Sequence, residues 1–163
     1  MNRWNVCIAV VLMVSCVGFS AAPSKSQHVR VFKKARRLEV LSPTGKVIRE
    51  YRVALGDDPV GTKVCEGDEK TPEGNYKLDF INEKSRFYRS IHVNYPLAKD
   101  KEAAKRKGCS PGGDIFLHGT GSLNIGRAHQ LVDWTDGCVA VSNAEIDEII
   151  SLLKLPARIE INP

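Results

Sequence analysis

Glycine and proline divide most of this 163-residue chain into short segments, and this spacing constrains the fold more than any other feature. Leu38 to Leu41 and Val47 to Leu55 contain many β-forming residues and flank a turn of sequence Ser42-Pro43-Thr44-Gly45. The segment from Gly56 to Gly74 contains two prolines and two internal glycines, so no helix fits there. The pattern predicts a domain that is mainly β.

Further strands are expected after this loop. Asn75 to Ile81 and Phe87 to Val93 carry aromatic and aliphatic residues in a strand-like pattern. Ile115-Phe116-Leu117 is another apolar segment, and it ends at His118. Between these strands, Lys99 to Lys107 is charged and contains alanine, which predicts a short exposed helix ended by a glycine.

A second helix is predicted near the C-terminus. Ser142-Asn143-Ala144-Glu145 has the pattern of a capping box, in which Ser142 and Glu145 satisfy each other's backbone amides. Apolar residues then recur at helical spacing and form one stripe: Ile146, Ile149, Ile150 and Leu153. We expect Pro156 to stop this helix and residues 158–161 to form a closing strand.

The segment before the first expected strand is basic. Residues 24–37 include the charge run Lys33-Lys34-Ala35-Arg36-Arg37, which we expect to be a solvated edge. The whole chain has a net charge of +5, a surplus too small to indicate nucleic-acid binding. Hydrophobic residues make up 42% and charged residues 26%, the proportions of one globular domain.

The first residues have the pattern of a secretory signal. Arg3 precedes an uncharged run from Val6 to Phe19, and the small residues Ser20-Ala21-Ala22 follow it. The run has 14 residues, fewer than the roughly 20 that span a bilayer as a helix. We therefore predict a signal peptide over residues 1–22 and one domain over residues 23–163.

Such a signal implies secretion across the inner membrane, into the periplasm or cell envelope. Cleavage after Ser20 and cleavage after Ala22 are both open. Met13-Val14-Ser15-Cys16 also resembles a bacterial lipobox, and lipid on Cys16 would be the one route to a membrane tether.

Removal of the signal changes the cysteine count. Cys65, Cys109 and Cys138 remain, and in an oxidising compartment they form one pair plus a free thiol, or three thiols. Cys138 lies in Thr135-Asp136-Gly137-Cys138-Val139, at the tight entry to an apolar run, where its sulfur can face a cleft. With His118 it supplies the minimum set of groups for thiol catalysis.

The combination of His118-Gly119-Thr120 and Thr135-Asp136-Gly137-Cys138-Val139 resembles the signature of the L,D-transpeptidase (YkuD-type) catalytic domain of bacterial cell-wall enzymes. The likeness covers nearly all of the chain after the signal and includes several upstream segments: Ala54-Leu55-Gly56, Thr71-Pro72-Glu73-Gly74, Ser85-Arg86-Phe87, His92 through Tyr95-Pro96, and Gly113 through Gly119. Three positions depart from the family pattern, because Thr135 stands in the place of a serine, Asp136 in the place of a histidine and Ala140 in the place of an arginine.

The resemblance implies a β-sandwich or barrel-like domain with one or two short helices and a cysteine acyltransferase activity. Cys138 would be the nucleophile and His118 the general base, with the carbonyl of Gly119 orienting the imidazole and the amides of Gly137 and Cys138 in the oxyanion hole. Further residues would contact substrate: Thr120, Arg127, His129, Trp134, Thr135 and Asp136. Asp136 is expected to turn away from the sulfur, since a carboxylate there would disfavour the thiolate.

The implied substrate is the stem tetrapeptide of peptidoglycan. Cys138 would attack its L,D bond, release D-alanine and pass the acyl group to an amine of a second stem or of another acceptor, in cell-wall cross-linking or attachment. Neither a metal nor an organic cofactor would be needed. An L,D-carboxypeptidase or an amidase acting on the same substrate class is the first alternative. A non-catalytic wall-binding module with a structural Cys138 is the second.

Cys65 and Cys109 lie in loops that the resemblance places near the mouth of the site. We hypothesise a disulfide between them, which by chain entropy would contribute roughly 4 kcal/mol to stability.

Overall fold

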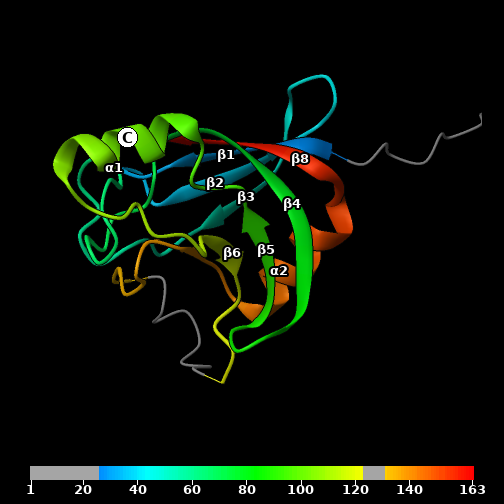
Figure 1. Ribbon diagram of the computed structural model, residues 1–163. Coiled ribbons are helices and arrows are strands. Elements are labelled where there is room, and N and C mark those ends of the chain that lie inside the picture. Colours follow the sequence, from blue (N-terminus) through cyan, green and yellow to red (C-terminus); the bar gives the residue numbers. More distant parts are fainter. Residues whose placement is uncertain (1–25, 123–130) are drawn as a thin grey trace, which may run out of the picture.

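A single mixed sheet of eight strands forms most of the protein, as the computed structural model shows for residues 26–122 and 131–163 (Figure 1). The strands are β1 (Ser26–Phe32), β2 (Arg37–Leu41), β3 (Val47–Arg52), β4 (Gly74–Ser85), β5 (Tyr88–Val93), β6 (Phe116–His118), β7 (Val139–Ala140) and β8 (Leu153–Asn162). Their order across the sheet is β3-β2-β1-β8-β4-β5-β6-β7. The pairs β1–β8 and β6–β7 are parallel, and the other neighbours are antiparallel.

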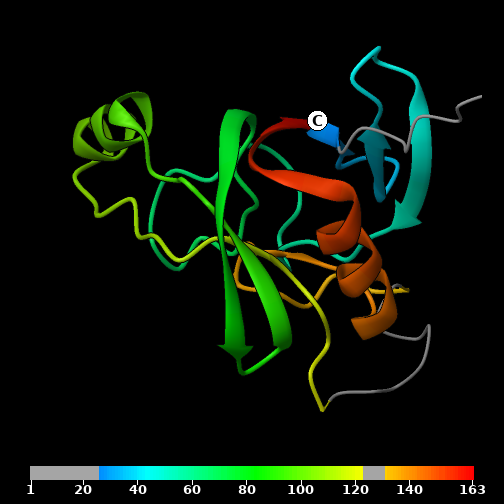
Figure 2. The ribbon, with the colours of Figure 1, turned by 90° about the vertical axis from the view of Figure 1, so that its right-hand side faces the viewer.

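The sheet curls so that its two outer strands approach each other. Bridges join Ala54 to Ala140 and Gly56 to Thr135, so the segment after β3 pairs with the β7 region at the opposite end of the strand order. The result is a half-barrel, and the expectation of a mainly β, barrel-like domain is confirmed. The curl brings the loops before β6 and β7 beside the β4–β5 hairpin, which projects from the sheet in Figure 2.

Two helices flank the sheet on separate sides (Figures 1 and 2). Helix α1 (Ala98–Lys107) ends at Gly108, which adopts the left-handed conformation with φ of 73°. Helix α2 (Asn143–Leu152) begins with the predicted capping box, in which the Glu145 amide donates to Ser142 Oγ over 3.2 Å. Both predicted helices are therefore present.

The end of α2 differs from the expectation. The helix stops at Leu152, and β8 begins at Leu153 and includes Pro156. Leu153, Ala157 and Ile159 of this strand are buried, so burial in the sheet overrides helical spacing at Leu153.

The expectation that the charge run over residues 33–37 is a solvated edge before the first strand is wrong at Lys33, whereas Lys34 and Ala35 are exposed. Residues 26–32 form β1, which lies inside the sheet between β2 and β8, and Val29 and Val31 are fully buried. Lys33 follows directly, and its side chain is only 2% exposed. Its ammonium reaches the Thr71 carbonyl over 3.0 Å and a Glu73 carboxylate oxygen over 2.8 Å, and it also donates to the Gly61 carbonyl. Three acceptors thus compensate the burial of the charge.

We predict that Lys33→Ala lowers the free energy of unfolding by about 3 to 5 kcal/mol, because it leaves Glu73 and two carbonyls without their buried donor. The adjacent residue, Lys34, is exposed and offers the control. Lys34→Ala should change the free energy of unfolding by less than about 0.5 kcal/mol. Urea denaturation of both variants measures the difference. Equal effects of the two substitutions would contradict this role of Lys33.

The expected signal peptide over residues 1–22 lies outside the described residues. Within residues 26–122 and 131–163, no helix is long and apolar enough to cross a membrane.

Candidate active site

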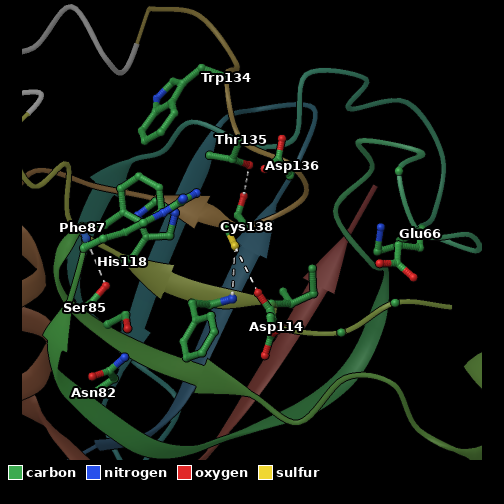
Figure 3. Close-up of a pocket in the computed structure, with 18 of the residues that line it drawn as sticks. Glu66, Asn82, Ser85, Phe87, Asp114, His118, Trp134, Thr135, Asp136 and Cys138 are labelled. Atoms are coloured by element: carbon green, nitrogen blue, oxygen red, sulfur yellow. Dashed lines mark hydrogen bonds between the residues drawn. The ribbon is translucent and has the colours of Figure 1, made fainter.

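A pocket of about 960 Å³ opens between the β4–β5 hairpin, the loops before β6 and the turn before β7 (Figure 3). Cys138 and His118 both line it, although 20 residues separate them in the sequence. Parallel pairing of β6 with β7 explains their proximity, since it sets Leu117 opposite Val139 and His118 opposite Ala140.

Cys138 occupies the turn that leads into β7. Its sulfur accepts a hydrogen bond from the Phe116 amide over 3.4 Å and lies 3.6 Å from the Asp114 carbonyl oxygen, to which the thiol donates (Figure 3). The preceding residue, Gly137, has φ of +122°, and a Cβ there would lie 2.6 Å from the Lys70 carbonyl oxygen. Only glycine fits this position, so the tight turn that aims the sulfur depends on it.

Burial raises the pKa of the Cys138 thiol to about 11, and the charges of Asp136 and Asp114 act in the same direction. The Phe116 amide opposes this shift by donating to the sulfur. The resting group is therefore a neutral thiol, which needs a base to become a nucleophile.

His118 ends strand β6, and two aromatic rings and a backbone carbonyl hold its imidazole in place. Its imidazole stacks on Phe87 with a centroid distance of 4.4 Å and meets Trp134 edge-on at 5.8 Å. Nδ1 lies 2.6 Å from the Gly119 carbonyl oxygen. Because a carbonyl can only accept, Nδ1 carries the proton, and Nε2 is the basic nitrogen of the neutral ring.

Burial lowers the pKa of His118 to about 4, and the nearby Arg86 guanidinium lowers it further, while the hydrogen bond to Gly119 opposes the shift. The imidazole is consequently neutral at physiological pH. The resting site pairs a neutral thiol with a neutral base.

This burial predicts a loss of stability in acid. The unfolded chain binds a proton to this histidine near pH 6.5 and the folded chain only near pH 4, so the unfolded state holds more protons between these values. As the pH falls from 6.5 to 4, His118 should lower the free energy of unfolding by about 3 kcal/mol, with no such loss above pH 6.5.

Denaturant unfolding of wild type and His118→Gln at about pH 7.5 and pH 4 measures this effect. The stability of wild type relative to the variant should fall by about 3 kcal/mol between these two conditions. A relative stability that does not change with pH would show that the buried ring does not carry the effect.

The side chain of Asn143 acts as a clamp on the loop after His118, through hydrogen bonds to the backbone of that loop. The Asn143 amide oxygen accepts from the backbone N–H of Thr120 over 2.9 Å and of Gly121 over 3.1 Å, and its nitrogen donates to the Gly121 carbonyl. Asn143 thus fixes the loop whose Gly119 carbonyl orients His118. Its place at a helix start gave no sign of this contact.

The Gly137 N–H, which we expect to donate to the oxyanion, already has a hydrogen-bond partner in the structure. This N–H donates to Thr135 Oγ1 over 3.2 Å, and the threonine hydroxyl donates in turn to the Cys138 carbonyl over 2.8 Å. Thr135 therefore braces the turn from within, and the Gly137 N–H is occupied. The Cys138 N–H has no hydrogen-bond partner among residues 26–122 and 131–163.

The other predicted contact residues fall into three groups. Trp134, Thr135 and Asp136 line the pocket, and the Asp136 carboxylate points away from the sulfur in Figure 3. Thr120 is buried beside Asn143 and does not line the pocket. The remaining two, Arg127 and His129, lie outside the described residues.

Cys65 and Cys109 form a disulfide, as hypothesised, with Cα atoms 5.7 Å apart. The adjacent Glu66 amide donates to the Ser110 carbonyl over 2.7 Å. The disulfide thus joins two loops that both contribute to the wall of the pocket. Cys138 is the free cysteine of the described part of the chain.

Residues 26–161 match the family model YkuD, the L,D-transpeptidase catalytic domain. Because the match covers most of the chain, the protein belongs to this family, and the resemblance drawn from the motifs is confirmed. "Putative L,D-transpeptidase YafK" of Escherichia coli (strain K12) is 24% identical over 169 residues, an alignment that covers 90% of this chain and 62% of the relative.

Solved structures show the same fold. The helical cell shape determining protein Pgp2 from Campylobacter jejuni superposes with a TM-score of 0.66 and 24% identity, over 84% of this chain and 47% of Pgp2. Bd1075 of Bdellovibrio bacteriovorus gives a TM-score of 0.59 and 27% identity, over 84% of this chain and 48% of that protein. The chain thus spans about half the length of these two proteins.

Proposed function

We propose that this protein is a peptidoglycan L,D-transpeptidase in which Cys138 is the nucleophile and His118 the general base. The observation that carries the proposal is the pocket itself, which presents the thiol beside an imidazole whose Nδ1 is held by the Gly119 carbonyl. That hydrogen bond leaves Nε2 to accept a proton, and membership of the L,D-transpeptidase catalytic domain family supports the substrate class.

In the first half-reaction, His118 Nε2 takes the thiol proton as the Cys138 sulfur attacks the carbonyl carbon of the L,D bond of a stem tetrapeptide. The carbonyl electrons move to oxygen, and the tetrahedral intermediate collapses with cleavage of the C–N bond. The imidazolium returns the proton to the departing nitrogen, so D-alanine leaves as an amine and a thioester remains on Cys138.

Stabilisation of the oxyanion falls to the Cys138 N–H in this proposal. This amide has no partner among the described residues, whereas the Gly137 amide is held by Thr135. An N–H that is free in the resting site can donate to the developing negative charge without first breaking another hydrogen bond.

In the second half-reaction, an amine of a neighbouring stem attacks the thioester and forms a cross-link. Water in place of that amine would give a shortened tripeptide, the outcome of an L,D-carboxypeptidase, and an amidase would release a group attached to the wall. Both partners of the transfer, donor and acceptor, are stem peptides in this proposal.

Incubation with purified muropeptides followed by mass spectrometry tests the proposal. We expect dimers joined through the third residue of the donor, together with free D-alanine. Tripeptide without any dimer would replace the transpeptidase by a carboxypeptidase, and the absence of any product would support the wall-binding module.

We further propose that residues 1–22 direct the protein to the periplasm or cell envelope, where its substrate lies. A role in cell shape follows from the same activity, because cross-links determine the form of the wall, and the structurally similar Pgp2 is described as a cell shape determining protein.

A further inference from the structure

The pocket carries opposite charges on its two sides. Phe87 and His118 lie on one side of Cys138, and Glu66 and Asp114 lie on the other (Figure 3). Two cations of the β4–β5 hairpin, Lys84 and Arg86, also line the pocket. The site therefore presents positive charge on the His118 side and negative charge on the opposite side.

Lys84 and Arg86 differ from the other cations nearby in having no carboxylate partner among the described residues. Arg89, on the same hairpin, is held by Glu83 and Asp147 at 2.6 and 2.7 Å. The third lysine of the pocket wall, Lys63, is buried and donates to Asp68. Two exposed cations without a carboxylate partner among the described residues thus face a cavity, an arrangement that favours an anionic ligand.

Contacts on the hairpin connect Arg86 to the catalytic base. The Arg86 guanidinium lies 4.6 Å from the centre of the Phe87 ring, and Phe87 stacks on His118 at 4.4 Å. Gly121 packs against the same turn, because a Cβ there would lie 2.6 Å from the Arg86 carbonyl oxygen. The backbone that carries the two cations is therefore held against the His118 loop.

The chemistry of the reaction places the leaving group on this side. His118 must protonate the departing nitrogen, so the leaving amino acid lies between the scissile bond and His118. In a D-amino acid, the free carboxylate is attached to the carbon next to that nitrogen. From there the carboxylate can reach the cations of the hairpin, which would attract it, and it stays away from Glu66 and Asp114, which would repel it.

We propose that Lys84 and Arg86 form a carboxylate subsite that binds the free α-carboxylate of the leaving D-amino acid. The inference rests on the proposed function and adds to it the residues that recognise the free C-terminus of the tetrapeptide. A bound carboxylate also offsets the unfavourable effect of the Arg86 charge on an imidazolium at His118.

Two donor peptides that differ only at the C-terminus test the subsite, namely the stem tetrapeptide with a free carboxylate and the same peptide with a carboxamide. The wild-type protein should favour the carboxylate by about 10- to 100-fold in kcat/KM, the range expected for charge-assisted hydrogen bonds. In the double variant Lys84→Gln/Arg86→Gln, this preference should fall to about 3-fold or less. The reason is that kcat/KM falls for the carboxylate peptide and stays the same for the carboxamide peptide.

A control variant removes a positive charge from β4, the strand of Lys84, outside the pocket. Lys77 is exposed on β4 and does not line the pocket, so Lys77→Gln should keep the wild-type preference. Both substituted cations of the subsite are exposed as well, and thermal unfolding should show all variants folded. An unchanged preference in the double variant would overturn the subsite.

A second measurement needs no peptide turnover. Iodoacetate and iodoacetamide both alkylate a thiolate with loss of iodide, and they differ in that only iodoacetate carries a carboxylate. Peptide mass spectrometry measures the alkylation rate of Cys138 with each reagent. The rate with iodoacetate divided by the rate with iodoacetamide should be at least about 5-fold lower in the double variant than in wild type.

The two measurements separate the inference from the proposed function. If neither peptide is turned over by the wild-type protein, the proposed function fails, and the alkylation ratio still decides for or against the cationic subsite. A ratio that is equal in wild type and double variant would refute the subsite even if the protein is an active transpeptidase.

Discussion

Replacement of Cys138 by alanine is expected to lower kcat/KM for release of D-alanine from a stem tetrapeptide by about 10⁴-fold or more. In the proposed reaction the sulfur is the atom that forms the thioester, and no other thiol of the described chain lies in the pocket, since Cys65 and Cys109 are joined to each other. Mass spectrometry of muropeptide products measures the loss. Cys138→Ser should be similarly inactive, because the pKa of a hydroxyl is far above that of a thiol.

The substitution should leave the fold intact. Cys138 is half-buried, and the hydrogen bonds of its sulfur to the described residues are those with the Phe116 amide and the Asp114 carbonyl. Alanine fits the same turn, so thermal unfolding should occur near the wild-type temperature. A carbapenem should add its mass to wild type and leave Cys138→Ala unmodified. Full activity of a folded Cys138→Ala protein would show that the cysteine is structural and would favour the wall-binding module.

Replacement of His118 by glutamine is expected to lower kcat/KM by about 10² to 10⁴-fold. Glutamine can still donate to the Gly119 carbonyl, but it offers no nitrogen that takes the thiol proton at physiological pH. Initial rates of D-alanine release measure this loss. His92→Gln is the control, because His92 pairs with Asp79 at 2.8 Å and does not line the pocket, and its activity should match wild type.

The pH dependence gives an independent test of the same base. Since the pKa of His118 is about 4 and that of Cys138 is about 11, kcat/KM of the wild-type protein should be nearly constant between about pH 5 and 10. It should fall below pH 5, where the imidazole becomes protonated. A fall in kcat/KM with a midpoint near pH 6.5 would contradict the buried environment of His118 in the structure.

Local sequence patterns account for much of the fold. The capping box at Ser142 and the glycine after Lys107 mark where helices begin and end because they act through backbone groups a few residues away. The strands between turns follow in the same way from β-forming residues bounded by glycine and proline. Their lengths were less predictable, and β4 continues to Ser85 because β5 pairs with it there.

Patterns of charge were misleading where the partners are distant in sequence. Lys33 reads as part of a solvated basic run, yet its ammonium is buried against Thr71 and Glu73, about 40 residues away. Its hydrogen-bond partners decide the role of this group, and only the folded chain shows them.

The sequence by itself determined the family, the mainly β architecture and the two residues, Cys138 and His118, on which the proposed chemistry depends. Motifs carry this information because neighbouring residues set the turns and caps. The tertiary structure alone decided the environment of these groups: the stacking of Phe87 on His118, the clamp by Asn143 and the two cations at the pocket. These features arise when the curled sheet brings distant segments together, and burial and nearby charge then set the pKa values of the thiol and the imidazole.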